Sequence, residues 1–512
     1  MNQPAGDTPA ARRWTLVAAI LGSSMAFLDG TVVNVALPAI QDQLGATAAQ
    51  AQWVIESYAL FLAALLLVGG ALGDRFGRRR IFMDGVLLFT VAGVACAFAQ
   101  SPTQLVVARA VQGIGAALLV PGSLALISAT FPEQERGQAI GTWSAFSGIA
   151  AAIGPVVGGF LVDHYSWTWA FLINVPIGAA LLLVCMTRVP ESKAEPHEQP
   201  PLDVAGAVSA TVGLAGVVFA LIEAPVRGWS DALVIGAGLA GVVALALFFF
   251  VESRTRAPML PLRLLRIRNF AGANLLTLLL YAALGGGLYF FPLNLIQVQG
   301  YSAAAAGSAL LPFVAILFLL SRWAGKLVDR YGPRRPLVIG PLIAGAGFAL
   351  FAVPGVGGSY WSTFLPAVCV LGLGMAITVA PLTTTVMNSV GDEQAGLASG
   401  INNAVSRTGP LLAIAVFGIV MSAMFDSVLA EQLSAQDLPA ALQGAVMQQR
   451  EKLAALNVPL GADAAASAII KKAVGDAFVA GFRWVMLVCA GLAVLSGISA
   501  WLLIARKPQP RA

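Results

Sequence analysis

GALGDRFGRRRIFMDG, residues Gly70–Gly85, returns later in the chain as GKLVDRYGPRRPLVIG, residues Gly325–Gly340. Aligned without a gap, the two stretches share eight of sixteen residues. The matches include glycines and an aspartate, which a simple preference for basic loops does not explain. Each copy follows one apolar run and leads into the next. The repeat therefore indicates a chain built from two parallel halves.

The composition indicates the class of protein in which this repeat lies. The chain has 512 residues, of which 58% are hydrophobic and 11% are charged, whereas soluble domains carry about 25% charged residues. The net charge of +5 is spread over short loops, which argues against nucleic-acid binding. Four widely spaced cysteines and two loop histidines predict neither a disulfide nor a metal site. We therefore expect an all-α polytopic membrane protein.

Spanning a bilayer takes about 20 mostly apolar residues. Fourteen stretches meet this requirement, and an even number places both termini on one side. The expected spans are 14–38, 50–70, 81–99, 103–126, 137–161, 168–188, 203–223, 231–251, 270–291, 304–322, 337–353, 362–388, 397–424 and 479–503.

The repeat divides these spans if the seventh and eighth are an insertion, because the other twelve then form six plus six. Residues 1–188 are the expected N-terminal six-helix bundle, and residues 270–512 the C-terminal one, with an external helical insertion at about 426–476. Residues 189–269 hold a cytoplasmic linker, the two extra spans and a basic interfacial segment.

Basic residues decide the orientation, since loops rich in Lys and Arg stay in the cytoplasm. With both termini cytoplasmic, the loops on that side hold 22 of the 30 Lys and Arg residues. We expect a multi-pass protein of a bacterial plasma (inner) membrane, with an uncleaved first helix.

Four motifs resemble one family. LDGTVVNVALP (Leu28–Pro38), the loop motif at Gly70–Arg80, RAVQGIGAA (Arg109–Ala117) and GIAAAIGPVVGG (Gly148–Gly159) resemble motifs of the major facilitator superfamily. More narrowly, the chain is similar to the fourteen-span drug:proton antiporters over nearly its whole length. The resemblance implies the major facilitator fold, with two six-helix bundles plus two additional central helices, and a monomer.

The family resemblance also implies roles for two of these motifs. The loop motif is implied to be a gating latch that favours the outward-open state, although Pro333 and Pro336 set the second copy apart. Its residues are Gly70, Gly73, Asp74, Arg75, Gly77, Arg78 and Arg79, and in the second copy Gly325, Asp329, Arg330, Gly332 and Arg334. The fifth-helix motif implies exchange of substrate for protons, through Gly148, Gly154, Pro155, Gly158 and Gly159.

Three ionisable residues lie inside expected spans at similar depth. Counted from the outer helix ends, Asp29 lies about 13 Å down, and Glu56 and Arg109 roughly 9 Å down. Arg109 keeps its charge and can pair with only one carboxylate. The other carboxylate, Asp29 or Glu56, is the expected proton carrier. A static salt-bridge cluster holding three helices together is the alternative.

The C-terminal half contains no carboxylate deep in an expected span. Neutral or singly cationic lipophilic substrates therefore fit better than dications. Six polar or aromatic residues either line a substrate cavity or pack between helices: Tyr58, Asn274, Tyr281, Asn402, Asn403 and Arg407.

Two further segments carry expectations. Pro258–Phe270 is basic and amphipathic, which favours an interfacial helix. The external stretch at about 426–476 predicts a helical hairpin near the outer entrance, broken at Pro439 and Pro459. A lid, a docking site for a partner and passive decoration are all open roles for it.

We therefore expect a proton-coupled antiporter that exports lipophilic drugs or toxic compounds. An exporter dedicated to one natural product or lipid is the first alternative, and a proton-coupled nutrient symporter is the alternative of another class. An enzyme is not expected, because no nucleophile–base set or P-loop is found. The proton gradient would replace any cofactor, and the partners are small lipophilic substrates, protons and the bilayer. The sequence does not indicate whether a periplasmic adaptor protein takes part.

Overall fold

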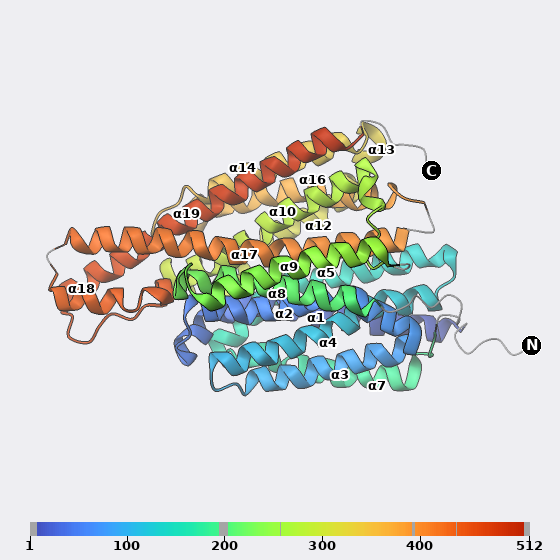
Figure 1. Cartoon of the computed structure of the whole chain (residues 1–512), viewed down its shortest axis with the longest axis horizontal. Coiled ribbons are helices and arrows are strands. Elements are labelled where there is room, and N and C mark those ends of the chain that lie inside the picture. Colours follow the sequence, from blue (N-terminus) through green and yellow to red (C-terminus); the bar gives the residue numbers. More distant parts are fainter. Residues whose placement is uncertain (1–7, 194–202, 256–257, 392–394, 437, 506–512) are drawn as a thin grey trace, which may run out of the picture.

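The computed structural model describes residues 8–193, 203–255, 258–391, 395–436 and 438–505, which form helices and connecting loops. Fourteen of the helical segments are long and apolar enough to cross a membrane, which confirms the expected number of spans. The first helix begins, and the last helix ends, at one end of the elongated bundle (Figure 1). We call this end the terminal end and the other the opposite end.

The first six spans form one bundle. Local signals set their limits: Thr47 and Gln50 form a capping box at the start of α2, and Gly45 ends α1 with a φ of 64°. The sixth span is interrupted after Leu172. The helices are α1 Pro9–Leu44, α2 Ala48–Phe76, α3 Arg78–Ala97, α4 Pro102–Thr130, α5 Glu133–His164, α6 Trp169–Leu172 and α7 Asn174–Arg188.

The last six spans form the second bundle, in which α10 packs between α17 and α19, and α14 packs against α16 and α19. Several of these spans are built from more than one helical segment. The segments are α10 Arg268–Leu293, η2 Asn294–Val298, α11 Ala303–Ser308, α12 Leu311–Gly325, α13 Leu327–Tyr331, α14 Arg334–Phe351, α15 Tyr360–Thr363, α16 Leu365–Met387, α17 Ala395–Ser434, α18 Ala440–Met447, η4 Arg450–Ala455 and α19 Ala464–Leu503.

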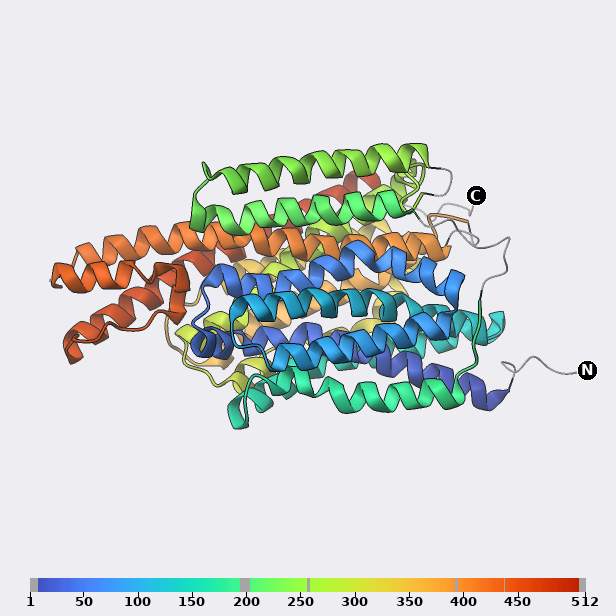
Figure 2. The same cartoon turned by 60° about the horizontal axis from the view of Figure 1, so that its bottom comes forward.

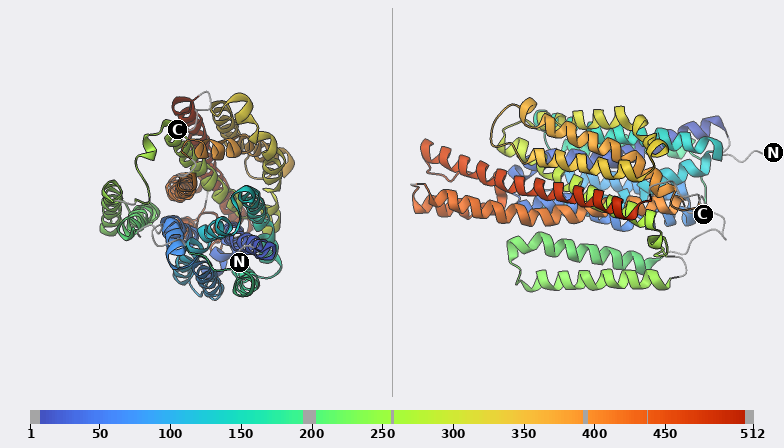
Figure 3. Two further views of the ribbon diagram at one scale, coloured as in Figure 1. Left: turned by 90° about the vertical axis from the view of Figure 1, so that its right-hand side faces the viewer. Right: turned by 90° about the horizontal axis from the view of Figure 1, so that it is seen from above.

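The two additional spans, α8 (Val204–Arg227) and α9 (Ala232–Arg254), form a pair at the side of the molecule (Figures 2 and 3). The pair is tied to α2 by Trp53, whose Nε1 donates to Glu223 Oε1 at 3.0 Å. The two helices touch at glycines: a Cβ on Gly241 would lie 2.6 Å from the backbone nitrogen of Val217. Small residues permit this close backbone approach within a membrane.

Two expectations about connecting segments need correction. The interfacial helix expected over Pro258–Phe270 is wrong, because only the short 3₁₀ turn η1 (Leu264–Arg266) forms before α10 begins at Arg268. Pro258 and Pro261 lack the N–H groups that a continuous helix needs. Residues 194–202 of the expected linker lie outside the described part of the chain.

The expected external hairpin at 426–476 is only partly right. Its two arms are continuations of membrane helices, because α17 and α19 each run for 40 residues and project beyond the other spans at the opposite end (Figure 1). The breaks fall where prolines predicted them: α18 begins directly after Pro439, and Pro459 lies in the loop before α19.

We predict that Gly241→Ala destabilises the protein, because the added methyl group meets the backbone of α8. Overpacking of this kind costs about 1–3 kcal/mol. The measurement is the midpoint of thermal unfolding of the purified protein in detergent. Gly236→Ala on the same helix is the matched control, since nothing lies within 4 Å of a Cβ there. Equal midpoints for the two variants would contradict the observed packing of α8 on α9.

Candidate functional site

A buried ion pair lies in the middle of the first bundle. Asp29 of α1 and Arg109 of α4 are both inaccessible to solvent. Arg109 Nη1 donates to Asp29 Oδ2 at 2.5 Å. The other carboxylate oxygen, Asp29 Oδ1, accepts from Gln112 Nε2 and from Asn174 Nδ2, each at 2.9 Å. Asp29 therefore has a counter-charge and two amide donors.

Arg109 is held from several sides as well. Its Nε donates to the backbone oxygen of Val54 at 3.0 Å, and its Nη1 also donates to Gln112 Oε1 at 2.7 Å. The guanidinium lies over the ring of Tyr58, 4.2 Å from the centroid, and Tyr58 donates its hydroxyl proton to the backbone oxygen of Ala26. The pair thus ties α1, α2, α4 and α7 together.

Glu56 is also fully buried, but it has no such partners. Neither of its carboxylate oxygens has a hydrogen-bond partner among the described residues, and its ion pair with Arg109 does not form. One turn earlier on α2, Gln52 Nε2 donates to the backbone oxygen of Ile414 on α17 at 3.1 Å. Tyr289 of α10 is close enough to Glu56 for the two side chains to interact electrostatically. Glu56 thus lies near the junction between the two bundles.

The sequence argument brought Asp29 and Arg109 together and left one carboxylate without a partner, as the structure has it. It missed the amide side chains. Gln112 lies in the quoted stretch RAVQGIGAA, one turn from Arg109, so its position on the helix could have revealed it. Asn174 reaches the site from the start of α7, and no local pattern points to it.

The residues considered for a cavity fall into three groups. Tyr58 packs under Arg109. Asn402 Nδ2 donates to Asn274 Oδ1 at 3.1 Å and to Thr277 Oγ1 at 2.8 Å, and so joins α17 to α10. The other three lie as follows: Tyr281 packs beside the core of the second bundle, Asn403 is exposed, and Arg407 is half-buried with its guanidinium over the ring of Phe27.

The loop motif is stabilised within its own bundle. Asp74 Oδ1 accepts from Arg78 Nε at 2.8 Å, and Gly77 makes the turn between α2 and α3 with a φ of 116°. Glu191 accepts from the backbone N–H groups of Arg79 and Arg80, at 3.0 and 3.2 Å. The other members of the motif lie close by: Gly70 beside Pro121, Gly73 beside Arg78, and Arg75 over Phe76.

The second copy repeats the turn but not the contacts. Gly332, which aligns with Gly77 of the first copy, also has a positive φ, of 73°. Arg330 lies over the ring of Tyr331, and Arg334 donates to the backbone oxygen of Trp501. Gly325 faces open space, and the side chain of Asp329 lies outside the described part of the chain.

The fifth-helix motif forms two close seams. A Cβ on Gly154 or Gly158 would collide with Thr31 or Val32 of α1, and one on Gly159 would lie 2.3 Å from the backbone oxygen of Ala303 at the start of α11. Pro155 meets α11 at Gly307. Gly148, nearer the terminal end, faces open space. The motif therefore packs α5 against α1 of its own bundle and against α11 of the second bundle, and it does so only toward the opposite end.

Further contacts close the opposite end. Asp163 accepts from the backbone N–H groups of Ala303 and Ala304, at 3.0 and 2.8 Å. Gln297 donates to Gln41 at 2.9 Å. Toward the terminal end, a Cβ on Gly141 or Gly148 would meet no atom within 4 Å. The two bundles are thus joined along α5 only at the opposite end, whereas α17 meets α2 nearer the terminal end, where a Cβ on Gly400 would lie 3.5 Å from Leu67 Cδ2.

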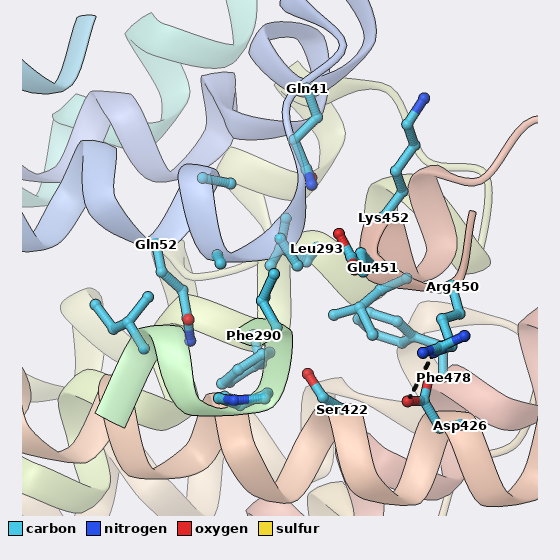
Figure 4. A pocket seen from close by; sticks show the side chains of 18 of the residues that line it. Gln41, Gln52, Phe290, Leu293, Ser422, Asp426, Arg450, Glu451, Lys452 and Phe478 are labelled. Carbon is cyan, nitrogen blue, oxygen red and sulfur yellow. Dashed lines mark ion pairs between the residues drawn. The ribbon is translucent and has the colours of Figure 1, made fainter. Parts of the chain in front are cut away.

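A pocket lies just beneath the projecting segment at the opposite end (Figure 4). The turn η4 covers it and contacts α1 and α2 as well as α17 and α19. Leu453 of η4 is buried and has a φ of 51°, and Arg450 Nε lies 3.5 Å from Asp426 Oδ2 on α17. Gln41, Gln52 and Phe290 line the pocket wall. The projecting segment therefore roofs the junction between the bundles.

Two six-helix bundles, the first of which embeds a buried ion pair, are typical of a polytopic membrane transporter. The Major Facilitator Superfamily profile matches residues 19–414, and the chain belongs to this family. Its predicted membership and fold class are thus confirmed.

Among its relatives is the tetracenomycin C resistance and export protein of Streptomyces glaucescens, 33% identical over 523 residues, which cover 99% of this chain and 96% of that protein. The multidrug resistance protein Stp of Mycobacterium tuberculosis is 36% identical over 420 residues, 82% of this chain and 78% of that protein. A bacterial homolog of the human lysosomal transporter Spinster, solved in an inward-facing and unoccupied conformation, shares the fold. Its TM-score is 0.68 at 18% identity, with 98% of this chain and 100% of that chain covered.

We predict that Asp29→Asn lowers the free energy of unfolding by about 3–5 kcal/mol, because it leaves Arg109 charged and buried without its counter-ion. Unfolding of the purified protein in detergent, followed by tryptophan fluorescence, measures the loss. The double variant Asp29→Asn/Arg109→Gln is expected to regain at least half of it. A double variant less stable than Asp29→Asn would show that the pair does not act as a unit.

We predict that Gly159→Ala loosens the closed end, because its methyl group wedges α5 away from Ala303. The readout is the rate at which a Gln41→Cys side chain reacts with a bulky maleimide, in a background without the four native cysteines. We expect the rate to rise about fivefold or more, since the wedge costs about 1–3 kcal/mol. Gly148→Ala adds the same methyl group in open space and should leave the rate unchanged. The same rate in both variants would contradict a seal at Gly159.

Proposed function

We propose that this protein is a proton-coupled antiporter that exports lipophilic compounds from the cytoplasm of a bacterium. The names of its relatives, resistance and export proteins, support the direction of transport. The Lys- and Arg-rich loops at the terminal end support a cytoplasmic location for that end in the plasma membrane. The loop motif then lies on the cytoplasmic side, where Asp74 and Glu191 order its turn within the first bundle.

The observation that carries the proton coupling is the contrast between the two buried carboxylates. Asp29 is bonded to one cation and two amides, so its buried oxygens are satisfied within the protein. Glu56 has no partner, and burial without one disfavours its charged form. We assign the proton to Glu56, and a structural role to Asp29 and Arg109.

The coupling then follows from the position of Glu56 at the junction of the bundles. When the bundles close around this position, water leaves, and only a neutral Glu56 closes at low cost. When the bundles separate on one side, water reaches the carboxylate and the proton can exchange. For the empty carrier, protonation from outside and release inside therefore accompany the return movement. In the export movement a hydrogen-bond donor of the bound compound satisfies Glu56 in place of the proton, so that compound and proton are exchanged and the proton gradient supplies the driving force without a cofactor.

A dedicated exporter of one natural product is the second candidate. It is supported by the tetracenomycin C relative, which aligns over almost the whole chain. A panel of dyes and natural products separates the two: broad transport favours multidrug export, and transport of a single compound favours the dedicated exporter. A nutrient symporter would move substrate in the same direction as the protons.

We predict that Glu56→Gln abolishes pH-driven transport while leaving the fold intact. Purified protein in proteoliposomes is given an imposed pH gradient, and the flux of ethidium, fluorescein and uncharged dyes is followed. The variant should lower the flux of each transported dye at least tenfold, and gradient-free exchange should persist. Glu223→Gln is the matched control, because it removes a partnered membrane carboxylate of the side pair. Normal pH-driven flux through Glu56→Gln would assign Glu56 a purely structural role.

A further inference from the structure

Arg407 is a second membrane-embedded guanidinium, and nothing in the proton mechanism uses it. It lies on α17, about 18 Å in from the start of that helix at the terminal end. Its guanidinium carbon lies 5.5 Å from the ring centroid of Phe27 on α1, so the side chain bridges the space between the two bundles. Tyr58 of α2 is close enough to Arg407 for the two side chains to interact electrostatically.

Arg407 has no counter-ion within the part of the chain that the structure describes. Its Nε is buried and makes no hydrogen bond. The ion pairs among the described residues join other arginines to their carboxylates. Arg109 shows the contrast, because it bonds Asp29, Val54 and Gln112. Of these two embedded arginines, Arg109 has a counter-ion and two further acceptors, whereas Arg407 keeps free donors.

This difference calls for an external acceptor. An arginine keeps its charge in proteins and offers five N–H donors in a planar fork. At membrane depth such a group is costly unless it is bonded. Water can solvate the exposed part of this side chain in the half-buried position described above. When the bundles close around Arg407, that water is removed. A hydrogen-bond acceptor on the bound compound must then replace it.

The residues around Arg407 indicate which kind of compound would carry this hydrogen-bond acceptor. One turn toward the terminal end, Asn403 is exposed on the same face of α17. Phe27 supplies an aromatic ring against the guanidinium. A cation without a counter-ion among the described residues, beside an aromatic ring and one turn from an exposed amide, suits an apolar or aromatic body that bears a negatively charged oxygen.

We propose that Arg407 is a substrate-recognition residue that binds an acidic oxygen, such as a carboxylate or phenolate, on the exported compound. This assignment rests on the proposed export function and names the substrate class. It differs from the expectation of neutral or cationic substrates, which rested on the scarcity of carboxylates in the second bundle and did not consider the missing counter-ion of Arg407.

Binding of two matched dyes tests the assignment. Rhodamine 110 carries a free carboxylate, and rhodamine 123 is its methyl ester on the same ring system. Fluorescence anisotropy with purified protein in detergent gives both dissociation constants without a proton gradient. Arg407→Gln should weaken rhodamine 110 binding at least tenfold, as expected for a hydrogen bond to a charged group, and change rhodamine 123 binding less than twofold. Arg407→Lys should lie between, since it keeps the charge and loses the fork.

The controls separate recognition from folding. Arg483→Gln removes an exposed arginine of α19 whose contacts are to Val353 and Pro354, and it should change neither constant. Unchanged rhodamine 123 binding shows that Arg407→Gln is folded. Equal loss of both dyes, no loss of either, or no binding of rhodamine 110 to the wild type would overturn the assignment. Selective binding in a protein that fails the pH-gradient assay would retain this site and refute the proton coupling instead.

Discussion

A charged side chain inside a membrane needs a partner, and the ion pair of Asp29 and Arg109 is where this protein meets that requirement. Its hydrogen bonds reach α1, α2, α4 and α7, so one electrostatic contact fixes four helices of the first bundle relative to one another. The amides of Gln112 and Asn174 complete the hydrogen bonding of Asp29. The other embedded charges, Glu56 and Arg407, differ by having no such partners, and this difference separates a structural pair from groups that are free to exchange ligands.

The contacts between the bundles are as unevenly distributed as the charges. Glycines of α5 bring its backbone against α1 and α11 toward the opposite end, where Asp163 and Gln297 add hydrogen bonds. Nearer the terminal end the same helix presents Gly141 and Gly148 to open space. One helix thus carries both the seal and the opening, which is the asymmetry that a carrier with alternating access requires.

The sequence predicts what depends on local composition and periodicity. The number of spans follows from apolar length, the two halves from the loop repeat, and the common depth of Asp29 and Arg109 from counting residues along helices. Contacts between distant segments were not accessible in this way: nothing local to Asn174 indicates that it bonds Asp29, and the lack of a partner for Arg407 is visible only in three dimensions. The external segment was misjudged for a related reason, since apolar length locates the membrane part of a helix but not where α17 and α19 end. At Pro258–Phe270 the charge pattern suggested a helix that the two prolines prevent.

The length of α17 has a mechanical consequence. With 40 residues, this helix is a rod of about 60 Å that carries Arg407 in its inner part and the roof of the external pocket near its far tip. A tilt of about 10° around its middle would displace each tip by roughly 5 Å, in opposite directions. If a compound binds at Arg407 as proposed, a small tilt of α17 around it would move the pocket roof at η4 by several ångströms, because both lie along the same helix.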